Sequence, residues 1–123
     1  MGMIEGVLIA ESLKVGAELS GVPLTMDSVL RVAATDATED QPKAWTLINF
    51  QADQVEAAQL AERFAAILDA PGWYVDFHTD SDVYVVFPGK VFHYSRGDRV
   101  GREQATRYAR TVGVPDSQLD WGD

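Results

Sequence analysis

The chain has 123 residues, an ordinary size for one domain, and no cysteine, which excludes disulfides, thiol chemistry and thiolate zinc sites. Its net charge of −9 at pH 7 repels nucleic-acid phosphates and anionic lipid, so neither nucleic acid nor a membrane is expected as a partner. Hydrophobic residues make up 46% and charged residues 24%, as in globular proteins. We expect a single α+β domain over residues 1–123.

The first half of the chain predicts three strands. Apolar residues alternate over residues 4–19, which is typical of a half-buried strand, although Glu11 interrupts the pattern. Residues 24–34 fit either a strand or an amphipathic helix, and the strand is preferred. A polar loop separates them from a third strand, which is expected over residues 44–52.

A helix should follow, because Asp53 makes a capping-box-like start and the apolar residues up to residue 70 recur at helical spacing. Three more strands are expected over residues 73–79, 83–87 and 91–95. The pattern then predicts a second helix over residues 98–112. The remaining residues are expected to form a C-terminal tail, residues 113–123, that packs on the domain and buries Trp121.

This order predicts an antiparallel sheet built from two β-meanders, each followed by an amphipathic helix (βββα-βββα), with the helices packed on one face. The two helical segments resemble each other weakly, with Phe64 corresponding to Tyr108. Two amphipathic helices that follow strands would also show this by chance, so the sequence leaves a duplication open.

Two turns set the expected strand pairing in the second half. A two-residue turn centred on Gly89-Lys90 and a turn at residues 80–82 place Phe77 opposite Val85. Alternate residues then form one apolar face that the helices would cover: Trp73, Val75, Phe77, Val83, Val85, Phe87, Phe92 and Tyr94.

The opposite face of these strands is the main candidate surface, because it would carry both histidines, an aspartate and two tyrosines. These residues are Tyr74, Asp76, His78, Tyr84 and His93. Strand spacing puts the histidines roughly 11–12 Å apart, too far for one metal ion. Polar aromatic residues are typical of interfaces, so a subunit interface is preferred over a small-molecule pocket.

A second candidate is the arginine cluster where the last helix begins. Backbone N–H groups and the side chains of Arg96, Arg99 and Arg102 could hold an anion there. Salt bridging to the acidic remainder of the protein is the preferred interpretation. The segments Trp73-Tyr-Val-Asp-Phe-His78 and Gln118-Leu-Asp-Trp121 are distinctive but carry no known mechanism.

The sequence therefore favours a small acidic, non-enzymatic protein-interaction module that self-associates as a homodimer and suits a basic protein partner. The alternative is a domain or minor enzyme that binds a small anionic molecule on the polar-aromatic face. No catalytic residue, metal or cofactor is predicted. The N-terminal residues lack the features of a signal peptide, so a cytoplasmic protein is expected, and the Arg-rich, Ala-rich composition is typical of GC-rich bacteria.

Overall fold

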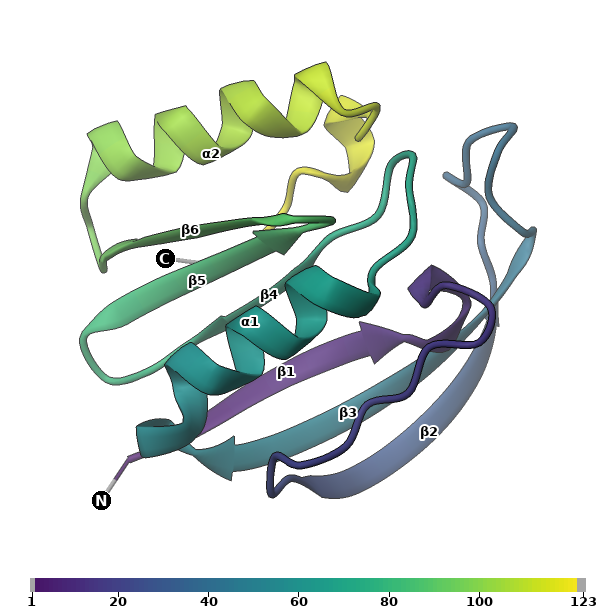
Figure 1. Cartoon of the computed structure of the whole chain (residues 1–123). Helices are drawn as coiled ribbons and strands as arrows, with labels where there is room; N and C mark the ends of the chain where they lie inside the picture. Colours follow the sequence, from purple (N-terminus) through teal and green to yellow (C-terminus); the bar gives the residue numbers. More distant parts are fainter. Residues whose placement is uncertain (1, 122–123) are drawn as a thin grey trace.

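The computed structural model describes residues 2–121 and shows a mixed α/β fold with an open, antiparallel, six-stranded sheet (Figure 1). Its strand order is β2-β3-β1-β4-β5-β6. The elements, in chain order, are β1 (Met3–Ile9), η1 (Ala10–Ser12), β2 (Thr25–Ala33), β3 (Ala44–Asp53), η2 (Gln54–Glu56), α1 (Ala57–Ile67), β4 (Val75–His78), β5 (Asp82–Phe87), β6 (Lys90–Ser95), α2 (Arg99–Thr111) and η3 (Asp116–Gln118). Within residues 2–121, no helix is long and apolar enough to cross a membrane.

The first half of the chain is not a meander, and this expectation was wrong. The strand preferred for residues 24–34 is confirmed as β2, but β2 lies at the edge of the sheet, outside β3. β1 pairs with β3 instead, with Gly6 opposite Phe50. The two halves therefore have different strand orders.

The strand expected over residues 4–19 ends at Ile9, because Glu11 and Ser12 form a turn. The Glu11 carboxylate accepts hydrogen bonds from the Thr46 amide (2.6 Å) and hydroxyl (2.8 Å), while the Ser12 hydroxyl donates to the Ile9 carbonyl (2.6 Å). The chain then leaves the sheet. Several of its apolar residues are half-buried against the core beside α1, although Val15 of the alternating set is exposed. The half-buried residues are Leu13, Ala17, Leu19, Val22 and Leu24.

Strands β4, β5 and β6 do form a meander, but with other registers than expected. Phe77 lies opposite Tyr84 rather than Val85, a shift of one residue that turns β4 over relative to β5. The turn is one residue shorter than expected, because the Thr79 amide donates to the Asp82 carbonyl (2.9 Å), and the Thr79 hydroxyl supports it by accepting hydrogen bonds from the amides of Ser81 (3.3 Å) and Asp82 (3.0 Å).

The β5–β6 turn is also displaced. Its central residues are Pro88 and Gly89, not Gly89-Lys90, so that Phe87 lies opposite Lys90. Proline followed by a glycine with φ of +72° is the signature of a type II turn. The register of β5 with β6 differs from the expected register by two residues, so the same side chains of the two strands still share a face.

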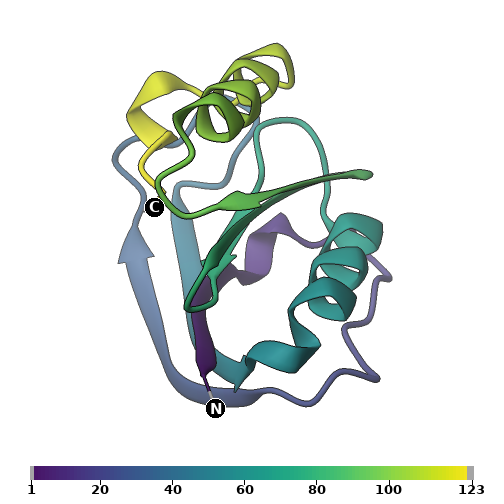
Figure 2. The ribbon, with the colours of Figure 1, turned by 90° about the vertical axis from the view of Figure 1, so that its left-hand side faces the viewer.

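The two helices lie on opposite faces of the sheet, not on one face. Figure 2 shows α1 and α2 on the two sides of β5 and β6. Tyr84 and Val86 of β5 pack in the core beside α1, whereas Val83, Val85 and Phe87 pack in the core beside α2. Every residue from 83 to 87 is buried, so this strand needs a helix on each side.

The C-terminal segment is fastened to the core beside α2. Trp121 is buried there, and its indole N–H donates to the Tyr94 hydroxyl (2.9 Å). The Arg102 guanidinium donates to the Trp121 carbonyl (2.7 Å) and lies 5.3 Å from the centre of its ring. These contacts hold the segment before Trp121, which includes Gln118 and Asp120, against the sheet.

Candidate functional site

The five residues predicted to share one face lie on two. The one-residue shift of β4 places Tyr74, Asp76 and His78 on the same face as α2, while Tyr84 and His93 face the α1 side. The shared polar-aromatic surface expected from the sequence therefore does not form. Tyr84 is buried and His78 is exposed.

Tyr84 and His93 belong to an aromatic stack. The Tyr84 ring stacks on His93 with 4.3 Å between centroids and on Phe77 with 5.1 Å. Nε2 of His93 lies 3.2 Å from the Asp82 carboxylate. Burial, with the charge of Asp82 as a second cause, raises the pKa of Tyr84. Tyr84 is therefore part of the core beside α1, and the exposed His93 ring packs on it.

The predicted arginine cluster surrounds a helix N-terminus that already has a carboxylate cap. Arg102 holds Trp121, and the N-terminus of α2 is already occupied by the Asp98 carboxylate, which accepts hydrogen bonds from the amides of Val100 and Gly101 (both 3.1 Å). An anion would compete with Asp98 for those donors. Arg96 and Arg99 lie exposed on either side of this cap.

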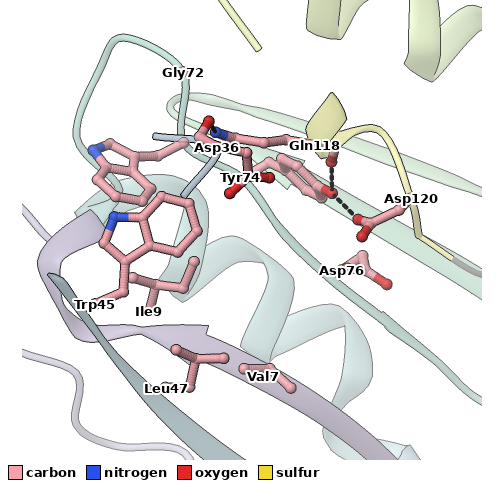
Figure 3. A pocket seen from close by; sticks show the side chains of 11 residues that line it. Val7, Ile9, Asp36, Trp45, Leu47, Gly72, Tyr74, Asp76, Gln118 and Asp120 are labelled. Carbon is pink, nitrogen blue, oxygen red and sulfur yellow. Dashed lines mark hydrogen bonds between the residues drawn. The ribbon is translucent and has the colours of Figure 1, made fainter. Parts of the chain in front are cut away.

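A pocket of about 300 Å³ lies on the α2 face of the sheet, beside the segment that carries Gln118 and Asp120 (Figure 3). Its apolar floor comes from Val7 and Ile9 of β1 and from Leu47 of β3. Two tryptophans form one side: the rings of Trp45 and Trp73 meet edge to face, with 5.5 Å between centroids. The volume is at the lower end of the range for ligand pockets.

Hydrogen bonds fix the polar wall of this pocket. The Tyr74 hydroxyl contacts the Gln118 carbonyl and lies 3.1 Å from Oδ1 of Asp120. The Gln118 amide donates to the Asp36 carbonyl (2.9 Å) and to the Gln41 side chain (3.0 Å). Segments from opposite ends of the chain are thereby held together around one opening, as Figure 3 shows for Tyr74, Gln118 and Asp120.

Three carboxylic acids line the pocket: Asp36, Asp76 and Asp120. Burial and then the charge of Asp120 raise the pKa of Asp76 to about 6, against the weaker opposing effects of its own backbone and Arg102. Burial also raises the pKa of Tyr74, which stays protonated. No Lys, Arg or His is among the described residues that line the pocket, so its charged lining residues are all acidic.

This arrangement suits the binding of an organic cation. Carboxylates beside aromatic rings attract an organic cation through charge-assisted hydrogen bonds and cation–π contacts, and the apolar floor accommodates its hydrocarbon part. The described lining has no thiol, amine, imidazole or aliphatic hydroxyl. Nor do any three acidic or histidine side chains in residues 2–121 come close enough to hold a metal ion.

Sequence patterns identified Tyr74 and Asp76 but missed the rest of the pocket. Asp36, Trp45, Gln118 and Asp120 come from three segments that only the folded chain brings together. The available signal was the pair of distinctive segments at residues 73–78 and 118–121, since both contribute to this one site. Comparisons with protein-family models, curated proteins and solved structures gave no match.

Proposed function

We propose that this protein is a non-enzymatic interaction module that binds a basic protein partner, and that its acidic aromatic pocket receives a Lys or Arg side chain of that partner. The observation that carries this proposal is the meeting of Asp76 and Asp120 with Trp45 and Trp73 around one opening. A basic side chain offers what this surface lacks: a cationic head on an apolar stem.

Charge on the whole molecule supports the same partner. A net charge of −9 draws a basic protein towards the surface and speeds its encounter, while the pocket gives the contact a fixed place. The alternative of an anionic ligand finds no comparable support, because the pocket is acidic and Asp98 caps the N-terminus of α2.

Binding of simple probes tests the proposal. N-acetyl-arginine amide and N-acetyl-lysine amide are titrated while tryptophan fluorescence is recorded, with the uncharged N-acetyl-citrulline amide as a control. We expect saturable binding of at least one cation and none of citrulline. Equal responses to arginine and citrulline, or no saturation with either cation, would overturn the proposal.

Variants locate the binding. Asp76→Asn with Asp120→Asn removes both charges while nearly keeping the side-chain shapes, and should abolish the response to the cations. Glu62→Gln removes one negative charge from the exposed surface of α1, outside this pocket, and should leave it unchanged. A similar loss in both proteins would indicate general electrostatic attraction instead of a site.

We also propose that the protein self-associates as a homodimer, since two-fold dimers are the commonest oligomers and several large apolar side chains on the sheet are exposed. Sedimentation equilibrium over a wide concentration range tests this directly. A monomer at every concentration would contradict it without affecting the pocket.

A further inference from the structure

The edge strand β2 is unusually open for a strand of its length. It runs for nine residues, and every one of them except Val32 is exposed. Met26, Val29 and Leu30 are 60%, 51% and 54% exposed. Successive side chains point to opposite faces, so apolar surface lies on both sides of this edge. An open edge with apolar side chains is a template for pairing with another strand.

The other edge of the sheet is different. β6 contacts both α1 and α2, whereas the substantial contacts of β2 are with β3 alone. A strand that approached β6 would meet helices on both faces. On β2 the side chains on both faces are exposed instead.

The sequence of β2 is self-complementary in an antiparallel, two-fold arrangement. If two copies pair with Val29 opposite Val29, Leu30 of each lies opposite Ser28 of the other. Asp27, which lies at the β-bulge next to Ser28, then comes near Arg31 of the other copy. Opposite charges across strands stabilise a sheet, and a two-fold axis makes each favourable contact twice. Shifting the pairing would separate these charges.

The position of the Arg31 side chain is compatible with such a contact to a carboxylate of a second copy. Its guanidinium donates to the Glu11 carboxylate (2.9 Å) and to the Thr46 hydroxyl (2.6 Å), yet its side chain remains 61% exposed. A second carboxylate can therefore approach a guanidinium whose position is already fixed. The β-bulge between Met26 and Ser28 ends the regular edge on one side and leaves residues 28–33 as its regular part.

We infer that β2 is the strand through which two copies of this chain pair, antiparallel and centred on Val29, so that their sheets join edge to edge. This inference rests on the proposed self-association and names its surface. It replaces the interface expected on Tyr74, Asp76, His78, Tyr84 and His93, which lie on two faces.

Charge reversal tests the pairing. Asp27→Arg places arginine beside arginine at both contacts of a homodimer, and Arg31→Asp places aspartate beside aspartate. Each variant alone should dimerise at least roughly tenfold more weakly than the native chain. An equimolar mixture should restore the dimer, because each Arg of one chain then meets an Asp of the other. Sedimentation equilibrium of the separate and mixed proteins measures this, and circular dichroism checks that each is folded.

A second variant keeps the test decisive if Arg31→Asp fails to fold through its new neighbour Glu11. Val29→Lys places two ammonium groups at the centre of the proposed axis and should give a monomer. Val100→Lys changes an exposed valine on α2 and should leave the dimer intact.

The outcomes separate the inference from the proposals on which it rests. A native dimer that survives both Asp27→Arg and Val29→Lys would overturn the β2 surface while self-association stands. Folded reversal variants whose mixture fails to dimerise would overturn the Val29-centred register. A native chain that is monomeric throughout would overturn self-association and its surface together, and binding of arginine amide to the pocket would remain a separate result.

Discussion

The hydroxyl group of Tyr74 lies 3.1 Å from Oδ1 of Asp120, and this contact joins the start of the second meander to the end of the chain. Asp120 is thereby held near Asp76, where its charge contributes to the raised pKa of that carboxyl. The Tyr74 hydroxyl thus positions Asp120 in the wall of the pocket and, through Asp120, influences the pKa of Asp76.

Replacing Tyr74 with Phe should loosen this wall. The Gln118 carbonyl and Asp120 both lose a hydrogen-bond partner, so we expect the free energy of unfolding to fall by about 1–3 kcal/mol. Urea denaturation followed by circular dichroism measures the change. Tyr108→Phe is the control, because the Tyr108 ring packs on Phe87 and Phe92, and this variant should change stability by less than about 0.5 kcal/mol. Equal losses in the two variants would contradict the role given to the Tyr74 hydroxyl.

Asp76 should make the protein less stable as the pH rises from about 4 to 6. Its pKa is about 6 in the folded state, above the ordinary value of 3.8, so the folded state binds the proton more tightly in this interval. The stability that this proton gives is complete below the unfolded pKa and is lost as the pH rises through the folded pKa. The effect is on the order of 1–3 kcal/mol.

The Asp76→Asn variant isolates this effect from the other acids. The difference in unfolding free energy between the variant and the native protein should move in favour of the variant between pH 4.5 and pH 7.5. Urea denaturation at the two values provides the comparison. A difference that is independent of pH would show that Asp76 titrates normally.

Cation binding should also depend on the ionisation of Asp76, but the affinity should rise with pH, whereas the stability falls. A bound ammonium or guanidinium favours ionised Asp76, so binding of arginine amide should be roughly tenfold weaker at pH 5 than at pH 7.5. Asp36, Asp120 and Tyr74 also surround the bound cation, but Tyr74 stays neutral. In the Asp76→Asn protein, any remaining binding should be nearly the same at both values. If the affinity of the native protein does not change with pH, Asp76 does not contribute to cation binding.

Gly6→Ala should destabilise the middle of the sheet. A Cβ atom at this position would lie 2.5 Å from Cζ of Phe50, a ring packed in the core beside α1. We expect a loss of about 1–3 kcal/mol from this overpacking. Thr25→Ala, at the exposed start of β2, serves as the control in urea denaturation. A stable Gly6→Ala protein would mean that Phe50 can move aside at little cost.

The sequence predicted the elements better than their arrangement. Local patterns identified the central turns of both helices, α1 and α2. Strand order could not be read in the same way, because the pairing of β1 with β3 depends on residues far apart in the chain. The apolar residues after Ile9 also alternate like those of a strand in the sequence, yet they lie in a loop where Val15 is exposed.

The prediction of which face β4 presents to α2 was wrong for a related reason. Residues 83–87 are all apolar or aromatic, so alternation on β5 indicates only weakly which face is buried, and the register depends on the turn. The shorter turn is supported by the Thr79 hydroxyl, whose hydrogen bonds no hydrophobic pattern reveals. The pocket was the feature least predictable from the sequence, because its lining residues are spread along the chain from Val7 to Asp120.

Strand β5 is a single wall between two hydrophobic cores. Tyr84 and Val86 close one core and Val85 closes the other, and they are neighbours along the same backbone. Neither core can open without uncovering one side of this strand and weakening the packing on its other side. The molecule should therefore unfold as one cooperative unit, with the amides of β5 among the last to exchange with solvent.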